Sequence, residues 1–173
     1  LNKFAPLHAM YGDMGWKPSH IGLKLNMLRL WNKLVKMQNN RIPKIVFLWE
    51  YNTGVNNWCT EIEQILNDIN CSDLYDNMNV CDINDCEKKL FLDYVSSWDT
   101  GRFDKPKLRT YNLFKNQYGV EKYVKTCDKY LQSHIAQLIA GVLPLNIKLG
   151  RHRQIELQDR KCVLCDYDEV EDE

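Results

Sequence analysis

Apolar residues recur along this chain at the spacing of an α-helix, and no stretch shows the sustained apolar/polar alternation that is typical of a half-buried strand. The clearest run has successive spacings of 4, 3, 4 and 3 residues, which predicts one face of a helix of about five turns. We therefore predict an all-α fold, an irregular helical bundle with a short Cys-x-x-Cys knuckle at the C-terminus. The residues of that run are Leu23, Met27, Leu30, Leu34 and Met37, and Leu28, Trp31 and Val35 widen the apolar stripe.

Capping residues and prolines predict several helix boundaries. Ser19, directly after a proline, is expected to be the N-cap of the first long helix. A short helix is predicted over residues 44–51, because a proline just before it suits a first helical turn. Asn57 is expected to cap the next helix, and Asn84 with Glu87 fits a capping box at the start of another.

Two regions follow from this pattern and from a change in charge near residue 101. Residues 1–100 are expected to form a helical scaffold region. Residues 105–173 are expected to form a basic helical region that ends in half of a zinc knuckle. Its last predicted helix begins near Leu131 and ends near Val142, and Gly141 and Pro144 bracket that end.

Charge is segregated along the chain, although the net charge is zero. Residues 1–49 carry 8 basic and 1 acidic side chains, residues 50–101 carry 2 and 11, and residues 102–161 carry 13 and 5. Residues 162–173 carry 6 acidic side chains and no basic ones. Such blocks create strong local potentials, unless the acidic block faces the basic blocks within the fold.

The basic segment that leads into a Cys-x-x-Cys is the most informative feature for function. A basic surface beside half of a zinc site is typical of nucleic-acid-binding proteins, with lysines and arginines on phosphates. Arg29, Lys33 and Lys36 are either a second contact strip or an ordinary solvated helix face. The residues that we predict to contact nucleic acid are Lys105, Lys107, Arg109, Lys115, Arg151, His152, Arg153, Arg160 and Lys161.

Aromatic residues are interleaved with these cations and are candidates for stacking on bases. A stripe at spacings of 3 and 4 is more often core, so Tyr111 and Phe114 are expected to be buried. Tyr118, Tyr123 and Tyr130 are the other candidates.

Seven cysteines, with no secretory signal, indicate free thiols in a reducing, intracellular compartment, cytoplasmic or nuclear. Cys162 and Cys165 have the spacing of two ligands of a structural zinc ion, and His152 and Cys127 are the nearest further candidates. The alternative is that both thiols are unbound in this piece, with zinc held only in a longer parent chain. A redox role is disfavoured because no strand–helix context surrounds the pair.

Nothing in the sequence arranges a catalytic site. There is no Walker-type phosphate loop and no Asp-Asp pair, and His134 is expected to be a structural histidine. No apolar run is long enough to span a membrane. We therefore expect a region without enzymatic activity.

The sequence resembles the C-terminal region of reverse transcriptases encoded by non-LTR (LINE-type) retrotransposons. The resemblance covers nearly the whole chain and is firmest from Lys105 onward. It rests on the order and spacing of several short pieces. They are Gly12-Asp13-Met14-Gly15-Trp16, Lys107-Leu108-Arg109-Thr110-Tyr111, Leu113-Phe114-Lys115, Ala136-Gln137, Gly141-Val142-Leu143-Pro144-Leu145, Gly150-Arg151, Arg160-Lys161-Cys162-Val163-Leu164-Cys165 and Val170-Glu171-Asp172-Glu173.

The resemblance implies that this region follows the polymerase and ends in a zinc knuckle whose first two ligands are Cys162 and Cys165. It implies that the remaining ligands, a His and a Cys, come after the acidic residues at the end of this chain. The implied role is to bind template RNA or target DNA while the polymerase domain upstream performs the chemistry. The alternative is a helical interaction module that docks on a polymerase core or on another partner.

Overall fold

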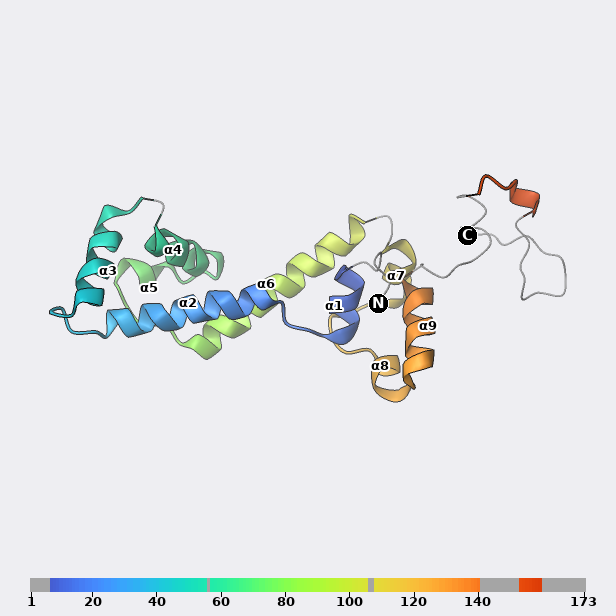
Figure 1. The fold of residues 1–173 in the computed structure, drawn as a ribbon, viewed down its shortest axis with the longest axis horizontal. Coiled ribbons are helices and arrows are strands. Elements are labelled where there is room, and N and C mark those ends of the chain that lie inside the picture. The colour runs from blue at the N-terminus through green and yellow to red at the C-terminus, as the bar shows by residue number, and fades with distance from the viewer. Residues whose placement is uncertain (1–6, 56, 106–107, 141–152, 160–173) are drawn as a thin grey trace. The chain divides into compact units, whose positions relative to one another are not determined.

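A computed structural model of the chain describes residues 7–55, 57–105, 108–140 and 153–159 (Figure 1). These residues contain helices and no strand, so the predicted all-α fold is confirmed. The predicted knuckle at Cys162 and Cys165 lies outside the described residues. The helices are α1 Leu7–Met14, α2 Ser19–Val35, α3 Ile42–Thr53, α4 Trp58–Asp68, α5 Ser72–Asp76, α6 Ile83–Phe103, α7 Arg109–Phe114, α8 Lys122–Thr126 and α9 Lys129–Ile139, with a 3₁₀ turn η2 at Leu157–Asp159.

The chain divides into two compact units. The central unit comprises Gly15–Gly101, and the terminal unit comprises Leu1–Met14 together with Arg102–Glu173. The sequence-based division placed residues 1–100 in one region. In the structure α1 belongs instead with the residues after Gly101, because the Gly119 N–H donates to the Gly12 carbonyl at 3.2 Å and the Glu121 N–H donates to the Asp13 carbonyl at 3.0 Å.

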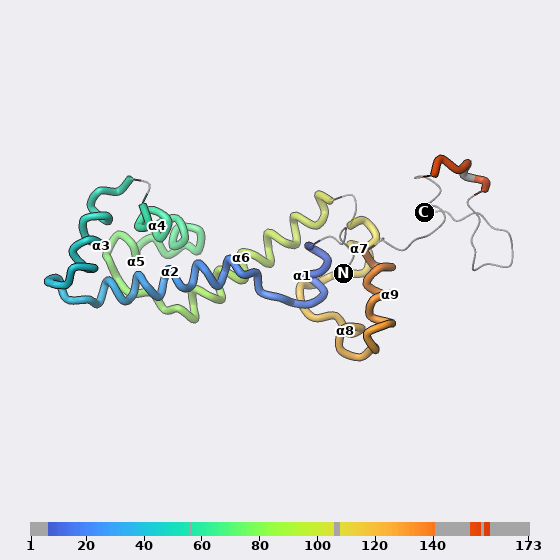
Figure 2. The backbone as a smooth tube through the Cα atoms, in the orientation of Figure 1, coloured from blue at the N-terminus to red at the C-terminus, as the bar shows by residue number. Residues whose placement is uncertain are grey.

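Within the central unit, α3, α4 and α5 are grouped around the C-terminal half of α2 (Figure 2). Trp31 lies at the centre of this core, and none of its side chain is exposed. Its ring stacks on Tyr75 at 5.4 Å between centroids and meets the edge of Phe47 at 5.4 Å, and its indole N–H donates to the Asn79 carbonyl at 2.9 Å. Burial of this indole and its aromatic partners is the main apolar contribution here.

The helix α2 buries part of the apolar face that was predicted. Its core residues are Ile21, Leu25, Leu28 and Trp31. Of the predicted stripe, Leu28 and Trp31 are buried as expected, and Met27 and Leu34 are half-buried against the core. Leu23 and Leu30 are instead 64% and 45% exposed. The face of α2 that carries Leu28 and Trp31 packs against the rest of the unit, and Leu23 and Leu30 lie outside it.

Side-chain caps explain where several helices begin. Asn57 forms a capping box with Thr60 at the start of α4, which confirms the predicted cap. Ser19 is the first helical residue of α2 and Pro18 is its N-cap, so the predicted cap there is wrong. The predicted Asn84–Glu87 box is also wrong, because the Asp82 carboxylate accepts from the Asn84 N–H at 2.9 Å. An aspartate before the helix serves the same free donors.

Candidate functional site

The predicted nucleic-acid contacts fall into three groups in the structure. Lys107, Arg151, His152, Arg160 and Lys161 lie outside the described residues, as do Cys162 and Cys165. The side chains of Lys105, Arg109 and Arg153 are exposed, as a contact with phosphate requires. Lys115 is buried.

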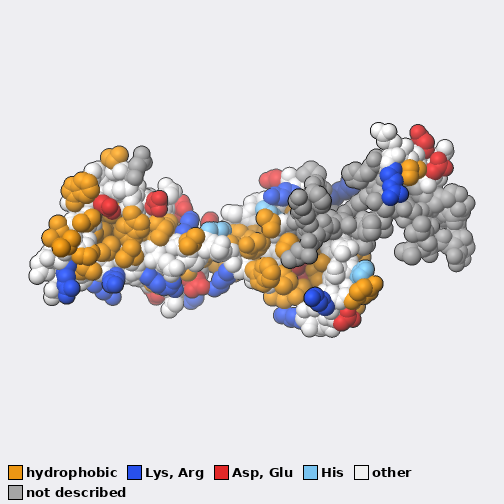
Figure 3. Space-filling model, in the orientation of Figure 1, with side chains coloured by type: hydrophobic (Ala, Val, Ile, Leu, Met, Phe, Trp, Pro, Cys, Tyr) orange, Lys and Arg blue, Asp and Glu red, His pale blue; other side chains and the backbone are white. Residues whose placement is uncertain are grey.

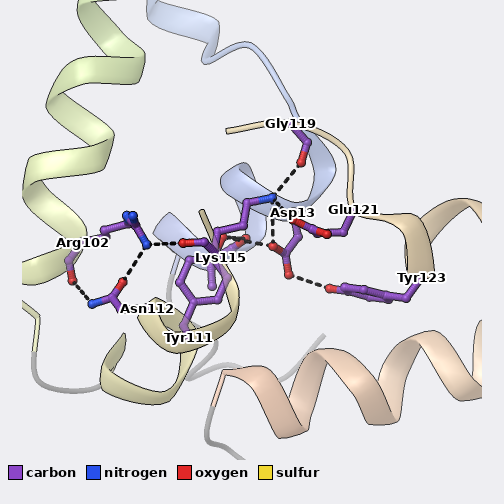
Figure 4. Close-up of polar contacts among 9 residues, drawn as sticks. Asp13, Arg102, Tyr111, Asn112, Lys115, Gly119, Glu121 and Tyr123 are labelled. Carbon is purple, nitrogen blue, oxygen red and sulfur yellow. Dashed lines mark hydrogen bonds and ion pairs between the residues drawn. The ribbon is translucent and has the colours of Figure 1, made fainter. Parts of the chain in front are cut away.

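The buried position of Lys115 excludes it as a phosphate contact in this structure, so that part of the prediction is wrong. Its side chain is only 2% exposed. The ammonium donates to the Gly119 carbonyl at 2.8 Å and to the Glu121 carboxylate at 2.5 Å, and it lies 3.5 Å from the Asp13 carboxylate (Figure 4). Lysine has three N–H donors, and these three neighbours account for them.

Asp13 is at the centre of the same buried network. Its carboxylate accepts from the Tyr111 hydroxyl at 3.0 Å and from the Tyr123 hydroxyl at 2.6 Å (Figure 4). Burial raises the pKa of Asp13, and the two phenols and the Lys115 ammonium oppose that rise. Burial, followed by the neighbouring Asp13 charge, raises the pKa of both Tyr111 and Tyr123. Two hydroxyl donors and one ammonium group therefore stabilise the Asp13 carboxylate.

Arg102 extends the network to the end of α6. Its guanidinium is buried and donates to the Lys115 carbonyl at 2.6 Å and to the Asn112 amide oxygen at 3.3 Å. The Asn112 amide donates back to the Arg102 carbonyl at 3.1 Å. These groups satisfy one another, so the arrangement fixes α1, α7 and the segment before α8 in place, and we assign it a structural role.

A helical hairpin formed by α8 and α9 carries the cations that sequence reasoning missed. Lys122 and Lys125 are exposed on α8, and Lys129 is exposed at the start of α9. Within the part of the chain that the structure describes, none of these three ammonium groups is in an ion pair. Figure 3 shows basic side chains over α8. Their spacing in the sequence, 3 and then 4 residues, was the available signal.

Hydrogen bonds hold this hairpin in shape. The Asp128 carboxylate caps α9 by accepting from the Tyr130 N–H at 2.9 Å and the Leu131 N–H at 3.0 Å. The Gln132 amide donates to the Val124 carbonyl at 2.9 Å and to the Cys127 carbonyl at 2.8 Å, which ties α9 to α8. The three lysines are therefore presented on a defined backbone.

The candidate aromatic residues differ in exposure. Tyr111 is fully buried, which confirms it as core, whereas Phe114 is 62% exposed and its predicted burial is wrong. Tyr130, beside Lys129, is 77% exposed. Its ring lies 4.3 Å from the His134 ring, and the His134 Nδ1 is 2.9 Å from the Tyr130 carbonyl. Tyr130 is thus an accessible aromatic face on the basic hairpin.

The basic block of residues 1–49 is only partly compensated by the acidic block. Lys17 pairs with Glu87, and Lys24 lies 3.3 Å from Asp68. Arg29, Lys33 and Lys36 are exposed along α2, and no carboxylate of the described chain pairs with them. A second basic strip therefore remains on the central unit.

The described cysteines are free thiols. Four of them, Cys59, Cys71, Cys81 and Cys86, are buried in the central unit, and Cys127 is half-buried. Burial raises the pKa of Cys59 to about 11, which makes that thiol a poor nucleophile at neutral pH. Among the described residues no three histidine, cysteine, aspartate or glutamate side chains are placed to hold a metal ion.

No family model, curated protein or solved structure matches this chain. None of the described helices is both long enough and apolar enough to cross a membrane.

Proposed function

We propose that this chain is a non-catalytic, nucleic-acid-binding region of a LINE-type reverse transcriptase, which contacts template RNA or target DNA through phosphates. The observation that carries the proposal is the α8–α9 hairpin, where Lys122, Lys125 and Lys129 are exposed beside Tyr130. The upstream polymerase domain of the parent protein would perform the chemistry, and zinc would belong to the longer chain through Cys162 and Cys165.

Physical chemistry favours phosphate as the ligand of the hairpin. Ammonium groups that are not neutralised by carboxylates gain affinity for a polyanion through release of its counterions. An exposed tyrosine stacks on any base, which is worth about 1–3 kcal/mol per base in single-stranded complexes. Because contacts with phosphate carry no sequence information, the hairpin should bind with little sequence preference.

Fluorescence anisotropy with labelled single-stranded RNA and DNA, measured from low to physiological salt, tests the proposal. We expect affinity to fall steeply with salt, by a slope of about −0.7 per neutralised phosphate for a single strand. Replacing Lys122, Lys125 and Lys129 by Gln should reduce the magnitude of that slope by about 2, since three contacts are lost. Tyr130→Ala should weaken binding and leave the slope unchanged.

The matched control is Lys88→Gln, an exposed lysine on the central unit, which should leave binding unchanged. An affinity that hardly depends on salt would contradict the proposal. So would a triple variant that binds as the wild type does.

A second candidate function, the helical interaction module, is favoured by a different observation. The central unit exposes large apolar side chains on α2 and α3, of which Trp49 is 68% exposed and Ile42 76% exposed. This surface lies on a different unit from the α8–α9 hairpin, so the two functions can coexist.

A further inference from the structure

The helix α2 carries a short apolar stripe outside its fully buried face. Leu23, Met27 and Leu30 each follow a buried residue of the core face by two positions, and two residues of an α-helix turn by about 200°. Leu23 is 64% and Leu30 45% exposed, while Met27 is half-buried at the edge of the core. Leu34 continues the row at helical spacing but packs against the core, as Met27 does, so the exposed part of the stripe is Leu23 and Leu30.

The following helix extends this surface. Four apolar side chains of α3 recur at the spacing of one helix face, and they are between 48% and 76% exposed. They are Ile42, Ile45, Val46 and Trp49. Figure 3 shows hydrophobic side chains gathered over α3 and along α2. Exposed apolar side chains gathered in this number on a folded unit indicate an interaction site.

Residues 15–49, which carry this surface, include basic side chains and no acidic ones. No aspartate or glutamate occurs between Met14 and Trp49. Arg29, Lys33, Lys36 and Arg41 are exposed, and among the described residues none of them is in an ion pair. In Figure 3 a row of basic side chains borders the hydrophobic area along α2. A partner that covers the apolar stripe must therefore lie beside these cations.

We propose that α2 and α3 form the docking surface for an acidic amphipathic helix outside this chain. The partner helix would place apolar residues on the exposed side chains of α2 and α3 and carboxylates beside Lys33 and Lys36. A second copy of this chain fits poorly, because two copies of α2 would bring the same cations together. A nucleic-acid backbone would meet the cations and leave Leu23, Leu30 and Trp49 without a partner. The inference makes the interaction function specific, and it does not depend on nucleic-acid binding by the α8–α9 hairpin.

The test uses the full chain and two designed peptides of three heptads, both with leucine at positions a and d. The probe has glutamate at the flanking e and g positions, and the control peptide has lysine there. We expect the glutamate peptide to bind, as measured by fluorescence anisotropy, and the lysine peptide to bind about tenfold more weakly or not at all.

Two variants of the surface sharpen the test. Leu23→Ser with Leu30→Ser, and separately Trp49→Ala, should each weaken binding of the glutamate peptide by about tenfold or more. These side chains are exposed, so the fold should tolerate their loss. Leu92→Ser is the matched control, since Leu92 is 67% exposed on α6 of the same unit. It should bind the peptide as the wild type does.

Four results would overturn the inference. They are absence of binding by the glutamate peptide, equal binding of both peptides, self-association that the Leu23/Leu30 variant abolishes, and binding to phosphatidylserine vesicles that the same variant abolishes. The Lys122/Lys125/Lys129 variant should bind the glutamate peptide normally. That result separates a failure of this inference from a failure of the nucleic-acid proposal.

Discussion

Replacing Lys115 by methionine should destabilise the terminal unit and leave the central unit intact. Methionine keeps most of the length of the side chain and removes the ammonium. The Asp13 carboxylate would then remain buried without its cation, and the Gly119 carbonyl would lose its donor. Glu121, whose side chain is 36% exposed, can turn to water and should contribute little.

The magnitude follows from the uncompensated carboxylate. Removing one partner of a buried ion pair typically costs about 3–5 kcal/mol. Asp13 keeps the hydroxyl donors of Tyr111 and Tyr123, and burial already raises its pKa, so it can take up a proton instead of remaining charged. We therefore expect the low end of that range, about 3 kcal/mol at neutral pH. The loss of stability caused by Lys115→Met should decrease as pH falls, because a protonated Asp13 is neutral and has no charge for the ammonium to balance.

Hydrogen–deuterium exchange measured by mass spectrometry reports each unit separately. Peptides from α1 and from residues 109–126 should exchange faster in Lys115→Met, because the free energy of local opening falls. All five tryptophans lie between residues 16 and 98 in the central unit, so urea unfolding followed by tryptophan fluorescence should be unchanged. Lys122→Met, the same change at an exposed lysine, should shift stability by no more than about 0.5 kcal/mol.

The double variant Asp13→Asn with Lys115→Met tests the physical cause. Because it removes the orphaned charge, it should be more stable than Lys115→Met alone, a coupling that a double-mutant cycle measures. If Lys115→Met were as harmless as Lys122→Met, the buried ion pair would not exist. A double variant less stable than either single one would refute the charge-based account.

Three further predictions concern the ionisable groups and the core. Burial raises the pKa of Asp13 in the folded chain above its value in the unfolded chain. The stabilisation that Asp13 contributes is therefore complete at pH values below its pKa in the unfolded chain, and it is lost as pH rises through its pKa in the folded chain. The terminal unit of the wild type should therefore gain stability relative to Asp13→Asn as pH falls from 7 towards 4, measured by hydrogen exchange. Trp31→Ala should cost the central unit about 3–5 kcal/mol in urea unfolding followed by far-ultraviolet circular dichroism, because a fully buried aromatic core residue is removed. Burial raises the pKa of Tyr75 to about 12, so absorbance at the phenolate band should show it protonated at pH 10 and ionised only at higher pH, where its contribution to stability is lost.

Local signals made the helices predictable. Apolar periodicity is a property of each segment, and a cap such as Asn57 acts on backbone N–H groups within three residues. The caps that failed, at Ser19 and at Asn84, missed by one or two positions, since a neighbouring residue can serve the same donors. The fold class could therefore be predicted although individual boundaries could not.

The candidate site was less predictable because its environment is built from distant residues. Lys115 belongs to a basic stretch in the sequence, but its partner Asp13 comes from the opposite end of the chain. No local pattern distinguishes a lysine that meets a carboxylate about a hundred residues away from one that faces solvent. Lys122, Lys125 and Lys129 were missed for the opposite reason, since their exposure depends on how α9 folds back on α8.

The amino-acid sequence determined that this chain is helical, where most helices lie, and that charge is divided into blocks, because these properties depend on neighbours along the chain. Tertiary structure decided which apolar side chains of α2 are buried. Leu23 and Leu30 satisfy the helical period as Trp31 does, but only Trp31 meets Phe47 and Tyr75. It also decided which cations remain at the surface, because burial and pairing depend on contacts between residues far apart in sequence.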